Sequence, residues 1–102
     1  MKKIFYDRNA LKELHNFSKD VQRDFQAYIE IVRIEGRLTL PYGKKIAKNL
    51  FEMRVHKRAS YRGFYAYVQR EYIVILVFFQ KKTKRIPLKR IETAKQRLKQ
   101  YE

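Results

Sequence analysis

Residues 72–79 form an uninterrupted apolar run, Tyr-Ile-Val-Ile-Leu-Val-Phe-Phe, which is rich in β-branched and aromatic side chains. Successive side chains of a strand point to opposite faces of its sheet, so a strand of this sequence has no polar face to turn toward water. Such a strand is typical of sheet positions that are covered on both faces. The run therefore predicts a central strand, and the rest of the chain has to supply both covers.

Two further segments before this run have the pattern of strands. Residues 50–55 alternate between apolar and polar side chains, as a strand with one buried face does. Residues 61–69 are rich in aromatic residues, and the Arg-Glu pair behind them suits a tight hairpin that leads into residues 72–79. We expect a loop at residues 56–60 and a short opening strand at residues 2–6.

Three segments have the periodicity of helices. Asp7 is placed to cap a helix that begins at Arg8, Ser18 to cap a second one that runs to about Ile34, and Gly36 to end it. Pro87 suits the first turn of a third helix. Their apolar stripes are Ala10, Leu11, Leu14 and Phe17, then Val21, Phe25, Tyr28, Ile29 and Val32, and finally Leu88, Ile91, Ala94 and Leu98.

The order of these elements indicates the fold class. Strand, two helices, three strands and a helix predict one α+β domain over residues 1–102. We expect a small antiparallel sheet of about four strands, mixed at one edge, with an N-terminal helical hairpin and a C-terminal helix. Residues 36–48 are expected to form a long basic connection, and long connections often carry function.

The charge of the chain is the first indication of function. Lys and Arg number 25 against 10 Asp and Glu, which gives a net charge of +15. Residues 1–35 hold 7 basic and 6 acidic side chains, whereas residues 36–102 hold 18 and 4. Neutralisation of phosphates releases counterions and drives binding, so this imbalance predicts a nucleic acid or another acidic partner. The absence of cysteine agrees with a cytoplasmic protein, and no apolar stretch is long enough to cross a membrane.

Several common enzyme sites are missing from the sequence. His15 and His56 lie far apart and lack the carboxylate or thiolate company of a metal site. His15 is expected at the surface of the first helix, and His56, which is nearer the basic region, has a small chance of touching a substrate. The acidic residues of the basic half are scattered, which makes a two-metal nuclease site improbable. We expect no metal and no cofactor.

A cationic cluster remains. In an antiparallel pairing, Arg54 near the end of one strand and Arg62 near the start of the next become neighbours, and Lys81 and Lys82 leave the end of the central strand. RNA can be cut by its own 2′-hydroxyl, and fixed cations stabilise the extra negative charge that then develops at phosphorus. The same residues equally suit simple phosphate binding, and charge alone favours that simpler role.

The motifs of the chain as a whole resemble a known family. Residues 49–55 (Asn-Leu-Phe-Glu-Met-Arg-Val), 61–65 (Tyr-Arg-Gly-Phe-Tyr) and 79–87 (Phe-Gln-Lys-Lys-Thr-Lys-Arg-Ile-Pro) are similar to the phage-derived, HigB-like branch of the RelE/ParE toxin superfamily. The resemblance covers nearly the whole chain. It implies a RelE-like fold and a toxin of a type II toxin–antitoxin system, an endoribonuclease that cuts messenger RNA on the ribosome without a metal.

The resemblance also implies roles for individual residues. Arg54 and Arg62 would contact the scissile phosphate, and Lys81 or Lys82 would assist charge neutralisation and protonation of the leaving group. Glu52 stands where the best-studied RelE-type enzymes carry a lysine that serves as a general base, whereas a glutamate is frequent in the HigB-like branch. It is either the base itself or the partner that orients Arg54, and we favour the orienting role because surrounding cations should keep its carboxylate ionised.

The remaining expectations concern contacts and partners. Residues expected to contact RNA or the ribosome are Lys44, Lys45, Lys48, Lys57, Arg58, Lys84, Arg85 and, by a loose match to a C-terminal aromatic position, Tyr101. The family implies an antitoxin with a helix-turn-helix, which alone would mediate contact with operator DNA. Two alternatives stay open: a non-catalytic inhibitor of DNA gyrase like those of the ParE branch, and a basic RNA- or ribosome-binding domain.

Overall fold

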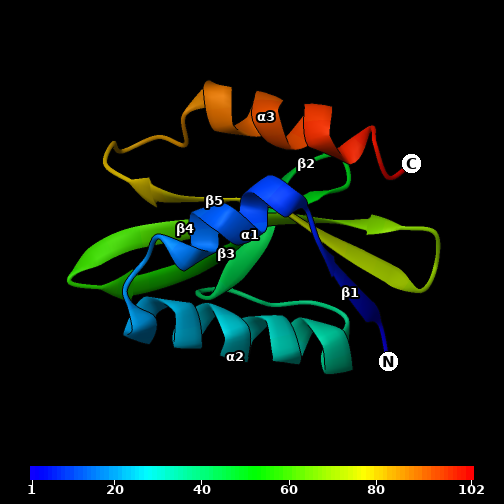
Figure 1. The fold of residues 1–102 in the computed structure, drawn as a ribbon, viewed down its shortest axis with the longest axis horizontal. Coiled ribbons are helices and arrows are strands. Elements are labelled where there is room, and N and C mark those ends of the chain that lie inside the picture. The colour runs from blue at the N-terminus through cyan, green and yellow to red at the C-terminus, as the bar shows by residue number, and fades with distance from the viewer.

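A five-stranded sheet lies between helices on its two faces (Figure 1), and the computed structural model describes residues 1–102. The strand order is β1-β5-β4-β3-β2, with β1 parallel to β5 and all other pairs antiparallel. The elements are β1 (Lys3–Tyr6), α1 (Arg8–His15), α2 (Lys19–Glu35), β2 (Gly43–Ala47), β3 (Leu50–Lys57), β4 (Ala59–Val68), β5 (Tyr72–Lys81) and α3 (Leu88–Leu98). The predicted α+β class is confirmed.

The apolar run at residues 72–79 takes the central place that its sequence predicts. β5 is paired on one side with β4 and on the other with β1, and it is buried from Ile73 to Phe79. Ile73, Ile75 and Phe78 join the core that α1 and α2 cover. The other face of β5 joins a second core, under Ala94 and Leu98 of α3. Each face of the strand thus has its own helical cover.

The helix ends follow the capping pattern of the sequence. Asp7 accepts hydrogen bonds from the backbone N–H groups of Asn9 and Ala10 at the start of α1. Gly36 ends α2 in the left-handed conformation, with φ of 89°, a region that glycine enters without steric cost. Ser18 precedes α2, but its hydroxyl donates to the Asp20 side chain and caps no backbone N–H group of the first turn. None of the three helices is long and apolar enough to cross a bilayer.

The stretch 36–48, expected as a connection, contains a strand instead. β2 pairs antiparallel with the first half of β3 and forms one edge of the sheet, so the sheet has five strands rather than about four. Its two central lysines are exposed, which is typical of edge strands and hides the strand pattern in the sequence. Gly43 is buried so closely that a Cβ there would lie 2.7 Å from the carbonyl oxygen of Glu52.

The expected loop at residues 56–60 is also shorter than predicted. β3 continues to Lys57 and β4 begins at Ala59, so the two strands join through a tight turn at Arg58, whose φ is 63°. The ladder between β3 and β4 therefore extends as far as the pair of Lys57 and Ala59. This extension exposes the site described below.

A bulge in β5 links the two helical layers. Phe64 pairs with Val77 and Tyr65 with Ile75, which leaves Leu76 as an extra residue without a partner on β4. The Leu76 carbonyl accepts a hydrogen bond from Arg97 of α3 at 2.8 Å. Glu13 of α1 accepts from the N–H of Phe78 and also pairs with the Arg97 guanidinium at 2.9 Å. Arg97 and Glu13 therefore satisfy the main-chain groups that the bulge frees.

Candidate functional site

Arg54 and Arg62 lie directly opposite each other on β3 and β4. Arg62 is in turn the partner of Phe79 on β5, whose side chain belongs to the core under α3. Both arginines therefore project from the α3 side of the sheet, near the turn that joins β3 to β4. The strand register thus places the two arginines side by side across the sheet, as their sequence positions predict.

Glu52 lies beneath the two arginines. Its side chain is fully buried, and its Oε1 accepts a hydrogen bond from Arg54 Nε at 2.6 Å. Its Oε2 is 3.4 Å from Arg62 Nε, and both of these atoms are buried without a hydrogen-bond partner. A charged pair that is removed from water is held mainly by such contacts, because each ion alone would be costly to bury. The carboxylate therefore fixes the spacing of the two guanidinium groups.

Arg62 is the less accessible of the two guanidinium groups. Its side chain is 14% exposed, against 29% for Arg54. Burial lowers the pKa of Arg62, and the neighbouring Arg54 adds to this effect while Glu52 opposes it. An arginine remains charged at neutral pH even so. The pair presents concentrated positive charge at the floor of a surface depression.

A groove of about 340 Å³ opens over this pair. The Arg54 N–H donates to the Tyr42 carbonyl just before β2 begins, and beyond that bond the outer edge of β3 has no neighbouring strand. The groove occupies this open edge. Its lining is Tyr28, Pro41, Tyr42, Arg54, Val55, His56, Ser60 and Arg62.

Lys81 continues the row of cations on β5. It is the strand partner of Ser60, two residues before Arg62 on β4. Its Nζ donates to the Lys84 carbonyl at 2.8 Å, which turns the side chain toward the connection that leads to α3. Lys82 is exposed directly after the strand. A cation that sequence reasoning missed is Arg90 of α3, whose guanidinium lies over the Phe79 ring, 5.2 Å from its centroid.

The other cations predicted to bind RNA are dispersed around this groove. Lys44 is the strand partner of Glu52, whereas Lys45 pairs with Phe51 and therefore faces the α2 side. Lys48 lies in the turn between β2 and β3. Lys84 and Arg85 are exposed in the connection before α3.

Three of the predicted contact residues are engaged within the protein. Lys57 Nζ is 3.2 Å from Asp24, and Arg58 is 2.7 Å from Asp20, so both pair with carboxylates of α2. The Ser18 hydroxyl and the Arg58 guanidinium hold the pKa of Asp20 well below its usual range. Tyr101 donates its hydroxyl to Asp7 at 2.9 Å. It lines a different hollow, beside the opposite ends of the strands.

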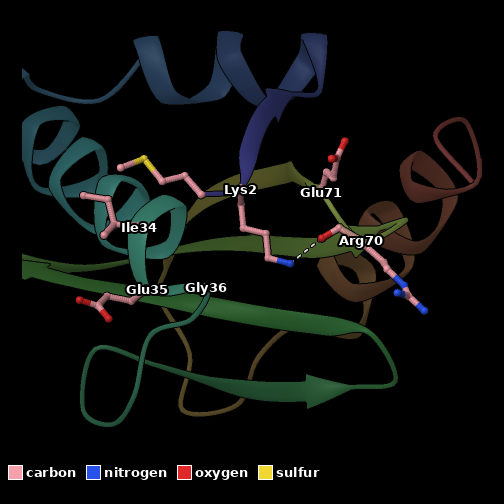
Figure 2. A pocket seen from close by; sticks show the side chains of 7 residues that line it. Lys2, Ile34, Glu35, Gly36, Arg70 and Glu71 are labelled. Atoms are coloured by element: carbon pink, nitrogen blue, oxygen red, sulfur yellow. Dashed lines mark hydrogen bonds between the residues drawn. The ribbon is translucent and has the colours of Figure 1, made fainter.

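A further hollow near the N-terminus has a different character (Figure 2). Lys2 reaches across it to the carbonyl oxygen of Arg70 in the β4–β5 turn, and the Arg70 guanidinium points away from it (Figure 2). Glu35 and Glu71 also line it, so charges of both signs meet there. This hollow lies at the end of β4 remote from Arg62 and lacks the one-sided charge of the groove.

His56 and Ser60 line the groove beside the two arginines, and sequence reasoning gave little weight to the first and none to the second. His56 follows Arg54 on the same face of β3, and its partner across the sheet is Ser60. The signal was present in the alternation of residues 52, 54 and 56, but it required β3 to continue to Lys57. Together the groove residues can hold a phosphate over two guanidinium groups, with an imidazole and a hydroxyl beside it.

Comparison with known proteins gives a consistent result. Residues 12–99 match the family described as "Phage derived protein Gp49-like". No curated protein matches the chain.

Solved structures with the same fold are toxins from E. coli. Isolated RelE is 12% identical with a TM-score of 0.68, over 90% of this chain and 97% of RelE. RelE in the intact RelBE toxin–antitoxin complex is 13% identical with a TM-score of 0.67, over 81% of this chain and all of that one. A doubly substituted RelE in the free state is 14% identical with a TM-score of 0.61, over 97% of this chain and 96% of that one. The expected RelE-like fold is confirmed.

Proposed function

The chain belongs to the phage-derived Gp49-like family and has the fold of the RelE toxin, and on that premise we propose that it is a toxin that cuts messenger RNA on the ribosome. The observation that carries the proposal is the pair of arginines. Arg54 and Arg62 face each other across two strands, above a buried carboxylate and at the floor of an open groove. A phosphodiester fits this arrangement because its charge meets two guanidinium groups at once.

The reaction proposed is an attack by the RNA on itself. The 2′-hydroxyl oxygen forms a bond to the adjacent phosphorus while the bond to the 5′-oxygen breaks, which leaves a cyclic phosphate and a 5′-hydroxyl. Arg54 and Arg62 stabilise the extra negative charge at phosphorus, and preorganised donors of this kind favour the transition state over the ground state. Lys81 and Lys82 are assigned to neutralise charge and to protonate the leaving 5′-oxygen.

Glu52 is assigned the orienting role. Its Oε1 is engaged by Arg54 Nε at 2.6 Å, and the whole side chain is buried beneath the two arginines. A fully buried carboxylate that accepts from one guanidinium group and lies 3.4 Å from a second is poorly placed to take a proton from RNA. It instead holds both guanidinium groups ready for the phosphate.

The proposed partners are a ribosome with its messenger RNA and an antitoxin. The net charge of +15 supports an RNA partner. A protein with this function acts in the cytoplasm, where ribosomes translate. RelE occurs in a complex with its antitoxin, and we assign this chain an antitoxin partner by the same relation. The antitoxin would carry the contact with operator DNA.

Primer extension on translating ribosomes tests the proposed function. The purified chain should cut a messenger RNA that is bound to ribosomes and leave the same RNA intact when it is free. Arg54→Ala should lower the cleavage rate by about 10²-fold or more, because one fixed donor to the developing charge is lost. Arg23→Ala is the matched control, since it removes an exposed cation from α2.

Two outcomes contradict the proposal. Intact messenger RNA on ribosomes excludes the nuclease function, and inhibition of gyrase supercoiling in the same preparation then supports the ParE-like alternative. An Arg54→Ala variant that cuts as fast as the parent removes Arg54 from the reaction. In that case the groove binds RNA, and the cleavage takes place elsewhere on the protein.

A further inference from the structure

The residues assigned so far leave the 2′-hydroxyl without a proton acceptor. Arg54 and Arg62 are cationic donors, and Lys81 is committed to the Lys84 carbonyl. Glu52 is buried, with its one hydrogen-bonded oxygen held by Arg54. A base has to lie at the groove surface, within reach of the phosphate that the arginines bind.

His56 occupies such a position. It stands two residues after Arg54 on β3, so its side chain leaves the sheet on the same face. It lines the groove together with Arg54 and Arg62, and it is exposed to solvent. Imidazole is the one common side chain that ordinarily titrates near neutral pH, so it can accept and return a proton there.

Ser60 fixes the orientation of this imidazole. The two residues are partners across the β3–β4 ladder, and the Ser60 hydroxyl oxygen lies 3.3 Å from His56 Nδ1. When Nδ1 carries the proton it donates to this oxygen, which leaves the lone pair of Nε2 free. The hydrogen bond at one ring nitrogen in this way decides which nitrogen serves as the base.

We propose that His56 is a catalytic residue of this groove, the base that takes the proton from the RNA 2′-hydroxyl, and that Ser60 is its positioning residue. The assignment rests on the proposed function and deepens it. The proton of the 2′-hydroxyl passes to His56 Nε2 as the oxygen bonds to phosphorus. The 5′-oxygen leaves with a proton from a lysine ammonium group; afterwards the imidazolium gives its proton to solvent and the lysine takes one up from solvent.

The charged groups around His56 fit this step. Arg54 on β3 and Arg62 on β4 share its groove, and Lys81 on β5 is the strand partner of Ser60. Tyr42, before β2, and Tyr28 of α2 face the groove from the other side. Glu52, the carboxylate on the same face of β3, is fully buried.

Single-turnover cleavage on messenger-programmed ribosomes tests the assignment. His56→Gln should lower the rate by about 10²- to 10⁴-fold, the usual contribution of a general base. Its affinity for the same RNA with a 2′-methoxy group at the cut site should stay within about twofold of the parent, because binding relies on the arginines. His15→Gln is the matched control, since His15 is exposed on α1 away from the groove. This variant should cleave RNA at the rate of the parent.

The pH profile and chemical rescue separate catalysis from structure. The parent rate should fall as the pH drops below neutral, because a protonated imidazole accepts no proton, and this limb should be absent in His56→Gln. Added imidazole should restore part of the rate to His56→Ala. Ser60→Ala should lower the rate moderately without a change in RNA affinity, and Ser60→Thr should restore it. The exposure of His56 means that these variants keep the fold, which a thermal melt verifies.

The outcomes distinguish this inference from the function it rests on. A parent protein that leaves ribosomal messenger RNA intact removes both the nuclease function and the role of His56. A parent that cuts while His56→Gln cuts equally fast, or keeps the acidic limb, overturns the assignment of His56 alone. Loss of RNA affinity in His56→Gln equally overturns it, because the residue is then a binding group.

Discussion

At the scale of single residues, the site depends on a buried charge triad of Glu52, Arg54 and Arg62. The carboxylate is fully buried, and two of the polar atoms between it and Arg62 have no hydrogen bond. Such an arrangement is costly to form and strongly destabilised when one charge is removed, because the remaining ions stay buried without compensation. The triad therefore serves the site, and the stability of the fold depends on all three charges being present.

Neutralising the central carboxylate should unfold the protein more easily. We expect Glu52→Gln to lower the free energy of unfolding by on the order of 3 kcal/mol, because the two guanidinium groups then face each other uncompensated. Urea unfolding followed by circular dichroism measures the change. Glu71→Gln, at an exposed position of the β4–β5 turn, should leave the midpoint nearly unchanged. Equal midpoints for the two variants would show that the triad contributes little to stability.

The sequence predicts part of this site because of its alternating pattern. Arg54 and Arg62 flank a short turn in two strands, so their meeting across the sheet follows from pairing rules alone. The burial of Glu52 and the hydrogen bond of His56 to Ser60 depend on where β3 ends and on what covers the sheet. Those are tertiary properties, and a single sequence carries no direct signal for them.

At the scale of elements, the close packing of β4 against its neighbours restricts one position beside the site. Gly63 lies between Arg62 and Phe64, and a Cβ there would stand 2.8 Å from the Phe78 ring and 3.2 Å from Met53. Both neighbours are buried in the core under α1 and α2. Both side chains are fully buried, so added volume has to displace either these side chains or the strand.

Adding one methyl group to β4 should therefore destabilise the sheet. We expect Gly63→Ala to lower the free energy of unfolding by about 1–3 kcal/mol through overpacking. It should also slow RNA cleavage, because a shift of β4 moves Arg62. Denaturant unfolding and the cleavage rate measure the two effects. A control is Ala27→Ser on the exposed face of α2, where little change is expected. An unchanged Gly63→Ala protein would mean that Phe78 moves aside freely.

The elements themselves were predictable where their pattern was strong. The apolar run at residues 72–79 and the capping residues Asp7 and Gly36 lead directly to β5, α1 and α2. β2 was missed because adjacent lysines, 44 and 45, interrupt any apolar alternation, and an edge strand needs none. The bulge at Leu76 was equally hidden, since it depends on Arg97 and Glu13 from distant helices.

At the scale of the whole molecule, five buried or partly buried tyrosines limit the stability of the fold at high pH. Burial raises the pKa of Tyr6, Tyr28, Tyr65, Tyr67 and Tyr101, most strongly for Tyr65. In the unfolded chain these hydroxyls ionise at about pH 10, whereas in the folded protein they stay protonated to higher pH. Stability from these groups is therefore complete below about pH 10 and is lost as the pH rises through the folded values.

The alkaline limit is measurable by urea unfolding at a series of pH values. The urea midpoint should be level from neutral pH to about pH 9 and then fall, because the unfolded chain releases tyrosine protons first. Tyr65→Phe should show a shallower fall above pH 10, since it removes the most perturbed group. A parent and a Tyr65→Phe protein with the same alkaline slope would refute the assignment to Tyr65.

The net charge of the molecule predicts how binding of the proposed RNA partner responds to salt. If about three phosphates are neutralised in the groove and around it, affinity for single-stranded RNA should fall about tenfold between 0.1 M and 0.3 M salt. Replacing Lys84 and Arg85 by glutamine should reduce this slope, whereas Arg23→Gln on α2 should not. Fluorescence anisotropy with an uncleavable RNA measures it. A slope that no lysine or arginine substitution alters would point to binding without phosphate contacts.

The late position of β5 in the chain has a consequence for biosynthesis. Six of the eight elements leave the ribosome before this strand, yet β1 finds its only neighbour in β5, and both cores require its side chains. A nascent chain therefore exposes an incomplete sheet until nearly the whole domain has been made. Arg54 and Arg62 pair within the β3–β4 hairpin, but both cores beneath that hairpin are complete only once β5 is in place.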